Sequence, residues 1–243
     1  MPSITVDNEE TLKIVSSSTI IIKSGKADIE YDLKDGDYAI LIFNDSDKDL
    51  VINDHGQIDN ASVTINYLQL DDHDLIQRSN IDVNKGSSLK VNATYLGSRN
   101  KDIIFDLINA GPDSLIDITS NIVCLDEASF RLDCIGTINR GSKRARCHQA
   151  NHCLTIGNPK KAAVLPVLNI DENDVEASHS LSSGTIDEEI LFYMNSRGLS
   201  AKEALNLILR SYLMTDEHFY DEFIDGKAIQ EMAVKKVDDL CSM

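Results

Sequence analysis

The feature that most constrains this fold is a stretch from about residue 10 to residue 180 that reads as strand after strand. Short runs alternate polar and apolar residues, which is typical of strands with one buried face. Turn signals rich in Gly, Asp and Asn separate the runs, and helical periodicity is almost absent. The clearest runs are 62–70, 88–95 and 115–119, and the turns include 35–37, 54–56, 85–87, 110–113 and 139–142. The stretch therefore predicts a mainly β domain.

Three architectures fit this spacing of strands and turns: a sandwich, a barrel and a parallel β-solenoid. Some strands carry consecutive apolar residues between polar ones, as in Ile103-Ile104-Phe105, which favours the solenoid. Asn and Asp are abundant at the strand ends, where a β-helix turns a corner and needs residues that tolerate left-handed backbone. No strict repeat is visible, so the pattern alone leaves the three architectures open.

The pattern becomes helical near residue 184. Thr185-Ile186-Asp187-Glu188 and Ser200-Ala201-Lys202-Glu203 both fit the capping box that opens a helix, and Gly198 is placed to end the first helix. The second helix carries one apolar stripe. The stripe consists of Ala204, Leu205, Ile208, Leu209, Tyr212 and Leu213.

A further helical stretch is expected from about Asp216, with a break at Asp225-Gly226, and it runs to Leu240. We therefore divide the chain into a β domain over residues 1–183 and a helical segment over residues 184–243. The apolar face of the helical segment either packs on the β domain or docks a partner, and the pattern leaves both open.

Charge and composition exclude several classes of function. Lys and Arg number 23 against 40 Asp and Glu, a net charge of −17 that repels nucleic-acid phosphates and anionic membranes at long range. The longest apolar runs fall far short of the roughly 20 residues that span a membrane. The N-terminus has no features of an export signal, and the five cysteines are an odd number, which favours reduced thiols in the cytoplasm.

The densest group of reactive side chains is the segment Cys147–Cys153, with two cysteines and two histidines. In a strand, Cys147 and Cys153 share one face roughly 20 Å apart, and His148 and His152 share the other roughly 13 Å apart. Neither pair can hold one ion, because zinc–ligand bonds are only about 2.0–2.3 Å long. A metal site there needs a sharp bend or ligands from elsewhere.

The chain has no Walker motif and no hydrolase motif, so we expect no nucleotide on this chain and no enzyme activity. A metal- or thiol-dependent enzyme that uses the Cys147–Cys153 segment remains an alternative, and so does a purely structural β-solenoid.

A resemblance to a known family comes from the stretch 174–205. Its motifs are an acidic-Val-x-x-Ser-His segment, a Gly-x-Ile-Asp-Glu-Glu segment, Leu-Phe-Tyr and Ser-Arg-Gly-Leu, at 174–179, 184–189, 191–193 and 196–199. Segments 136–138, 148–151 and 166–170 also match, in the right order. The chain resembles the SufB/SufD family of iron–sulfur cluster assembly scaffold proteins, most specifically from about residue 130 to residue 210. Family members usually carry a longer N-terminal region.

The resemblance implies a right-handed parallel β-helix followed by a small C-terminal helical segment. It implies a scaffold subunit rather than an enzyme, with a transient iron–sulfur cluster or iron as its cargo. The C-terminal helices would dock a SufC-like ABC ATPase, which would hold the nucleotide. The β-helix would pair with a second copy or with a SufB-like subunit.

The resemblance also names candidate site residues. SufB proteins carry a cysteine near the position of Asn151, and a glutamate directly after the histidine that aligns with His179. This chain has Asn151 and Ser180 there, so its site resembles SufD more closely. Cys153 would face the same way as Asn151 in a strand and could replace the missing thiolate. The expected cluster-binding residues are Cys153, His179 and Asn151, and the expected iron ligands are Cys153, His179 and His152.

Stacking of solenoid coils at about 4.8 Å predicts that His179 lies roughly 5–10 Å from Cys153 and Asn151. We expect this site near the end of the β-helix at which two subunits pair.

Overall fold

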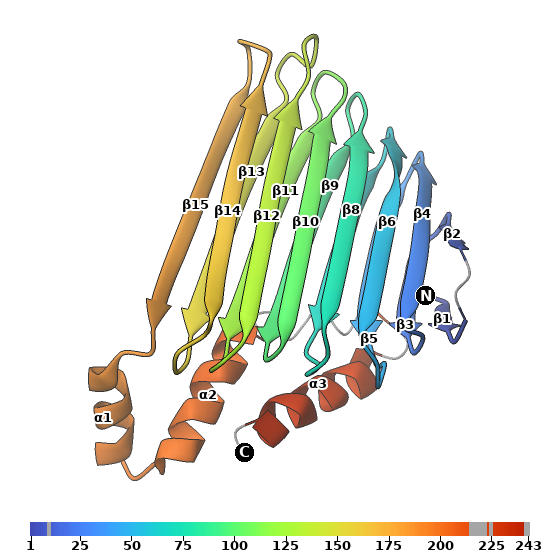
Figure 1. Ribbon diagram of the computed structural model, residues 1–243. Helices are drawn as coiled ribbons and strands as arrows, with labels where there is room; N and C mark the ends of the chain where they lie inside the picture. Colours follow the sequence, from blue (N-terminus) through green and yellow to red (C-terminus); the bar gives the residue numbers. More distant parts are fainter. Residues whose placement is uncertain (9–10, 214–222, 224–225, 241–243) are drawn as a thin grey trace.

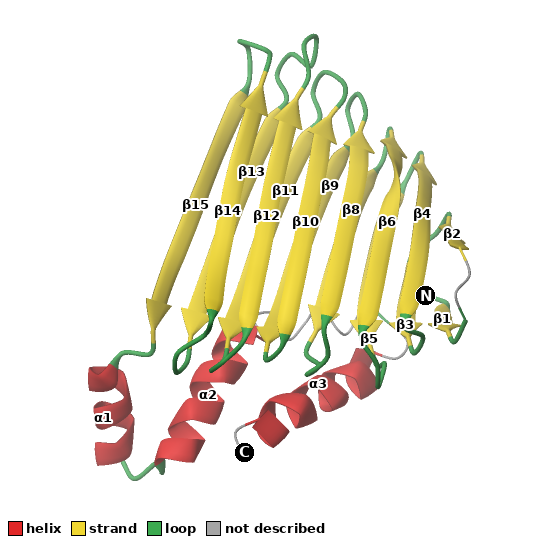
Figure 2. Cartoon of the chain, viewed as in Figure 1, coloured by secondary structure: helices red, strands yellow, loops and turns green. Residues whose placement is uncertain are grey.

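The structure is a computed structural model, and it describes residues 1–8, 11–213, 223 and 226–240. Within these residues, strands occupy almost all of the chain up to residue 185, and three helices follow (Figures 1 and 2). The strands are β1 (Ser3–Val6), β2 (Thr11–Ile14), β3 (Ser18–Ile22), β4 (Lys26–Lys34), β5 (Asp37–Asn44), β6 (Leu50–Asp59), β7 (Ser62–Gln69), β8 (Leu75–Val83), β9 (Ser88–Gly97), β10 (Asn100–Asn109), β11 (Leu115–Cys124), β12 (Ser129–Ile138), β13 (Arg146–Thr155), β14 (Lys161–Ile170) and β15 (Glu176–Thr185).

Neighbouring strands within each sheet lie two places apart along the chain and pair in parallel. The odd-numbered strands form one sheet in the order β1 to β15, and the even-numbered strands form a second sheet from β2 to β14. The chain thus winds between two facing sheets, and each coil adds one strand to each (Figure 1). The predicted parallel β-solenoid is confirmed, and the sandwich and barrel are excluded.

The core lies between the two sheets. Alternate residues of each strand point inward, as in β10, where Ile103, Phe105 and Leu107 are buried. Aromatic rings pack across this interior, with Tyr67 and Phe105 at 5.4 Å between ring centroids and a tilted arrangement. Tilted rings at this separation attract each other beyond the effect of burial alone, so the pair joins adjacent coils.

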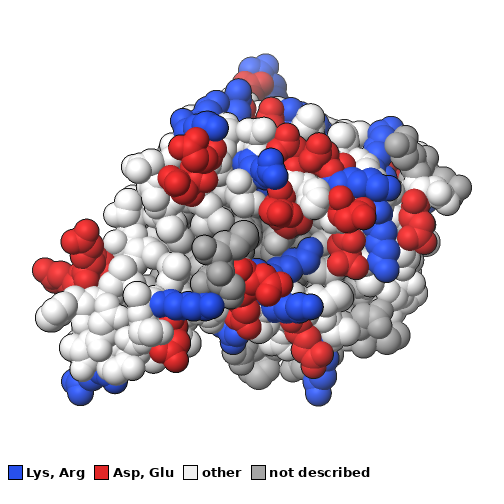
Figure 3. All heavy atoms as spheres, turned by 60° about the horizontal axis from the view of Figure 1, so that its bottom comes forward, with Lys and Arg blue, Asp and Glu red and all other residues white. Residues whose placement is uncertain are grey.

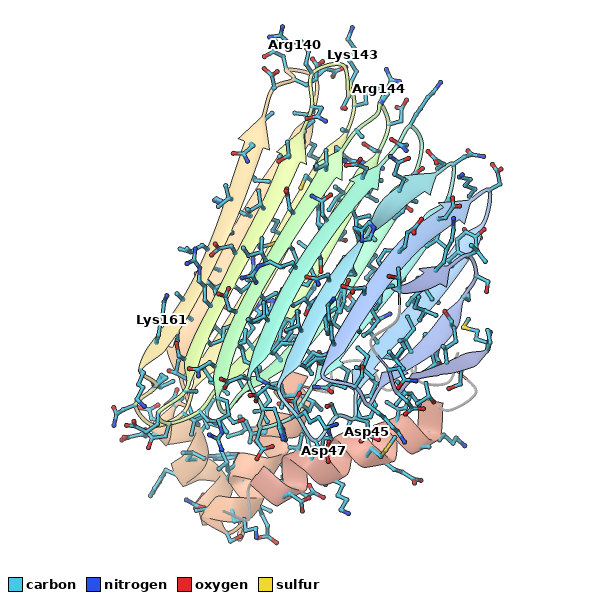
Figure 4. All side chains as sticks on the ribbon, turned by 45° about the vertical axis from the view of Figure 1, so that its right-hand side comes forward. Asp45, Asp47, Arg140, Lys143, Arg144 and Lys161 are labelled. Carbon is cyan, nitrogen blue, oxygen red and sulfur yellow. The ribbon has the colours of Figure 1, made fainter. Side chains whose placement is uncertain are left out.

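Several corner turns hold residues with left-handed backbone. Asp35, Asn60 and Asp113 have φ of 53°, 49° and 60°, as the abundance of Asn and Asp at strand ends predicts. Arg144 also has a left-handed φ of 57°, although arginine tolerates this conformation less well than Asn or Asp does. Its guanidinium donates two hydrogen bonds of 2.7 and 2.6 Å to Asp113 of the preceding coil, which favours the strained turn. Figure 4 shows Arg144 at the end of the solenoid opposite the helices.

The helices are α1 (Glu188–Ser196), α2 (Ala201–Leu213) and α3 (Gly226–Leu240), and they lie along one end of the strands (Figure 2). α2 and α3 pack their apolar faces on the outer face of the odd-numbered sheet and form a second core with it. The strand side of this core is Leu41, Phe43, Leu68, Leu70, Leu96, Val123 and Leu154, and the tail side is Leu209, Leu213, Phe223, Ile229, Ala233 and Val237. The apolar stripe of the second helix therefore packs on the β domain.

The helix boundaries correct one prediction. Thr185 still pairs with Thr155 in the sheet, so it does not cap α1. Asp187 is the N-cap, and its side chain accepts a hydrogen bond of 2.8 Å from the backbone N–H of Glu189. The predicted capping box at Ser200 and Glu203 is confirmed.

In that box, the Glu203 carboxylate accepts from the Ser200 N–H at 2.8 Å, and the Ser200 hydroxyl accepts from the Glu203 N–H at 3.3 Å. The end of α1 at Gly198 is also confirmed, because Gly198 has the left-handed φ of 97°. The expected helical start at Asp216 lies outside the described residues, and none of the described helices is long and apolar enough to cross a membrane.

Candidate functional site

Strand β13 carries the candidate residues, and its two faces are as predicted. One set of alternate residues points into the solenoid, and the two histidines lie on the outer face. The inward residues are Cys147, Gln149, Asn151 and Cys153, all buried, and the outer residues include His148 and His152, both partly exposed. The cysteines and histidines of this segment are thus separated by the thickness of a sheet.

The described cysteines are buried, free thiols. Burial raises the pKa of Cys153 above its ordinary value of 9.0, and it raises the pKa of Cys147 and Cys134 to about 12. These groups are protonated at neutral pH, which opposes the prediction that Cys153 acts as a thiolate. Cys241 lies outside the described residues.

His179 lies on β15, directly opposite Gln149 of β13. Asn151 pairs with Leu181 and Cys153 with Ser183, so these two residues are offset from His179 by two and four positions along the strand. Two positions correspond to about 7 Å and four to about 13 Å. The expected distance of roughly 5–10 Å from His179 therefore fits Asn151 but not Cys153. Coil stacking sets only the distance between neighbouring strands, and the register sets the additional offset along the strand.

His152 has a different environment from the other candidates. Its Nδ1 lies 2.8 Å from the hydroxyl of Ser182 on the outer face, and His148 makes the same contact with Ser178 at 2.9 Å. Cys153, His179 and His152 thus do not converge within one chain. Throughout the described part of the chain, no three His, Cys, Asp or Glu side chains are grouped closely enough to hold a metal ion.

The last coil of the solenoid is open. β14 and β15 are the terminal strands of the two sheets, and each has a described strand on one side only. Ile170 and Leu181 occupy inward-facing register positions, yet they are 48% and 43% exposed because no further coil covers them. His179 shares this open end and is also exposed. Its imidazole is therefore available to whatever covers the end.

Two buried amides attach the open coil to the body of the solenoid. Gln149 donates to the backbone carbonyl of Val167 on β14 at 3.1 Å, and Asn151 donates to that of Ser180 on β15 at 3.4 Å. The carboxamide oxygens of both residues have no hydrogen-bond partner in the structure. The inward-facing position of Asn151 and Gln149 is visible in the sequence, but the carbonyls that they contact are not.

The chain shows clear relationships to known proteins. Residues 41–212, more than half of the chain, match the model of the SUF system FeS cluster assembly SufBD core domain. The parallel β-solenoid and this match place the chain in the class of iron–sulfur cluster assembly proteins. The chain belongs to the SufBD family of iron–sulfur cluster assembly proteins.

Comparison with individual proteins supports the same family assignment. The chain is similar to the iron-sulfur cluster assembly protein SufD of Bacillus subtilis, with 32% identity over 117 residues, which cover 48% of this chain and 27% of the relative. A SufBD family protein of Methanothermobacter thermautotrophicus is 26% identical over 136 residues, which cover 50% of this chain and 33% of the relative. The matched part therefore spans a third or less of these curated relatives.

The burial of the thiols predicts their reactivity. We expect Cys124, Cys134, Cys147 and Cys153 to react with iodoacetamide at pH 7.5 at least about a hundredfold more slowly in the folded protein than in urea, because they are buried and protonated. Peptide mass spectrometry over a time course measures each site separately. Labelling of Cys153 at the same rate in the folded and unfolded protein would restore it as a candidate thiolate.

Proposed function

We propose that this protein is a SufD-like scaffold subunit that works with a SufC-like ABC ATPase, which docks on α1, and with a second β-helix, which covers the open coil. The observation that carries the proposal is the apolar surface of α1, which the β domain leaves uncovered. Membership of the SufBD family supports the assembly role.

The helix α1 has no buried residue. Ile190, Phe192 and Tyr193 are large apolar side chains that are 51%, 75% and 58% exposed, and Leu207 of α2 is 48% exposed. Isolated exposed apolar residues are common, but a cluster on one helix marks an interaction site. Leu205 and Leu209, which belong to the apolar stripe of α2, pack toward the β domain.

The surroundings of α1 also suit a protein partner. The surface on the left of Figure 3, where α1 lies in Figure 1, is mostly uncharged and has acidic side chains at one edge. Asp187, Glu188 and Glu189 form the acidic first turn of the helix. A groove of about 370 Å³ lies between α1, α2 and the ends of β13 and β15. An apolar centre with a polar rim is the usual arrangement of a protein interface.

The double substitution Phe192→Ser and Tyr193→Ser tests the ATPase interface. We expect it to weaken binding of a SufC-like ATPase by about tenfold or more, because exposed aromatic anchors supply most of the energy of such interfaces. Binding is measured by titration of the purified ATPase, and circular dichroism checks that the solenoid remains folded.

Ile76→Ser is a matched control, since Ile76 is 46% exposed on β8, on the even-numbered sheet rather than on the helices. Equal binding by the double variant and the wild type would place the interface elsewhere. Point substitutions are preferable to removal of everything after Gly184, because such a truncation would also uncover Leu68, Leu96 and Val123 of the second core.

The open coil is the surface that we assign to the second β-helix. β14 and β15 offer unpaired backbone groups along their outer edges, and natural proteins cover or pair such edges. Ile170 and Leu181 add apolar area between the two edges. A second copy of this chain, or a SufB-like subunit, would complete both the hydrogen bonding and the burial.

Leu181→Arg tests this assignment. We expect the substitution to weaken self-association, or association with a SufB-like subunit, by about tenfold or more, because it places an unpaired charge in the proposed contact. Sedimentation velocity over a concentration series gives the association constant, with Ile76→Arg as the control on an outer face. Unchanged association of Leu181→Arg would rule out the open coil as the interface.

His179 is the residue that we assign to the cargo. It is the one expected ligand that is exposed at the open end, and imidazole nitrogen suits iron. A single imidazole does not hold an ion firmly, so the remaining donors would come from the partner that covers the coil. Asn151 is offset from His179 by only two positions but is buried beneath β15, and Cys153 is buried further along the strand.

His179→Ala is expected to lower the iron retained after anaerobic reconstitution of the assembled complex by roughly tenfold, as for removal of one supporting group at a metal site. Iron and sulfide are measured per complex, together with the assembly state. His148→Ala, on the outer face of β13, is the matched control, and Cys153→Ser tests the buried thiol. Full iron retention by His179→Ala with intact assembly would contradict the site and favour a purely structural subunit.

A further inference from the structure

A carboxyl group is enclosed in the interior of the solenoid, away from the open coil. Asp54 lies on the inward face of β6 and is 1% exposed. Its register partners in the same sheet are Ile29 on β4 and Ser79 on β8, so a coil covers it on each side. In the described part of the chain, Asp71 is the only other carboxylate that is buried.

Asp54 is held by hydroxyl groups. Ser79 donates a hydrogen bond of 2.6 Å to Oδ1, the Tyr67 hydroxyl donates to Oδ2, and the Tyr31 hydroxyl lies 3.5 Å from Oδ2. These donors come from β8, β7 and β4, so the contacts join three coils and both sheets. The group thus sits where successive coils and the two facing sheets meet.

The described side chains that face Asp54 in the interior carry no positive charge. Tyr31, Tyr67 and Tyr95 face it from β4, β7 and β9, and Gln77 and Ser79 of β8 are neutral. His55, the next residue on β6, points to the outer face and is exposed. No lysine or arginine among the described residues forms an ion pair with Asp54, which is unusual for a fully buried carboxylate.

We propose that Asp54 is a proton-binding site inside the solenoid, and that proton uptake there strengthens the N-terminal coils as the solution becomes mildly acidic. The deprotonated carboxylate is stabilised mainly by its hydroxyl donors, with a smaller effect from the charge of His55 on the outer face. Protonation removes the buried charge. The protonated carboxyl group keeps one oxygen as a hydrogen-bond acceptor and gains an O–H donor. The hydrogen-bond network therefore accommodates both the ionised and the protonated carboxyl group. The buried surroundings favour the protonated form more than water does.

The pKa of Asp54 agrees in direction with this geometry. Burial raises it from 3.8 to about 6, against the opposing effect of the hydrogen bonds from Ser79 and Tyr67. Because the folded-state pKa is the higher one, the folded protein binds the proton more tightly. The contribution to stability is fully present below about pH 4 and is lost as the pH rises through about 6. Two-state linkage gives about a 25-fold fall in the folding equilibrium constant between pH 4.5 and 7.5.

Asp71 has the opposite behaviour and supplies a control. Its carboxylate accepts a hydrogen bond of 2.9 Å from the buried Lys101 ammonium. Burial would raise the pKa of Asp71, but the charge and hydrogen bond of Lys101 outweigh it, so the pKa is lowered. Asp71 therefore stays ionised throughout the range from pH 4.5 to 7.5, and its contribution to stability does not change there.

The test compares urea unfolding of the full chain as wild type, Asp54→Asn and Asp71→Asn at several pH values from 4.5 to 7.5. We expect the Asp54→Asn variant to lose the 25-fold component of the pH dependence that the wild type shows. Asp71→Asn keeps the Asp54 carboxyl but leaves Lys101 buried without its partner, so it should destabilise the protein at every pH, whereas Asp54→Asn should remove the component of the pH dependence that Asp54 supplies.

A second measurement covers the case in which Asp54→Asn does not fold. The carboxyl carbon of Asp54 in the wild-type protein is followed by NMR as the pH is changed, and its midpoint is expected near 6. A midpoint below about 4.5 would overturn the proposal. So would identical pH dependence of unfolding in a folded Asp54→Asn variant and the wild type.

Discussion

The structure depends on in-register parallel pairing between successive coils. Backbone hydrogen bonds fix each residue next to one residue of the coil before and one of the coil after, as with Ser120, Asn151 and Leu181. Side chains on the inner face therefore form columns along the axis, and each column member is covered by its neighbours. The last coil has no such neighbour, so Leu181 keeps a core position without core burial. This uncovered end is the reason that we propose an interaction surface there.

Features that depend on the alternation of side chains along a single strand could be predicted from the sequence. The alternation in β13 separates Cys147 and Cys153 from His148 and His152, because successive strand residues point to opposite faces. The distance from His179 to Cys153 could not be predicted, since it depends on which residue of β15 lies opposite Gln149. That register is set by the length of the intervening β14 coil and its turns, which no local pattern specifies.

Helix ends show the same division between local and non-local effects. The Ser200–Glu203 box is a local interaction and forms as its sequence indicates. Thr185 fits an equally good box, but the pairing of Thr185 with Thr155 extends β15 and moves the cap to Asp187. Similarly, the left-handed turn at Arg144 contradicts residue preference, and its contact with Asp113 one coil away supplies the compensation.

Polar groups in the interior behave differently according to their distance from the open coil. Asp54 lies between covered coils, so its hydroxyl partners and its proton equilibrium are set entirely by this chain. His179 lies opposite Gln149 in the register, but it is exposed because no described coil covers it on the far side. The proposed proton site on β6 and the proposed cargo site on β15 therefore lie in separate parts of the solenoid. The covered columns hold the coils together, and the uncovered end is where we place the proposed partner and cargo.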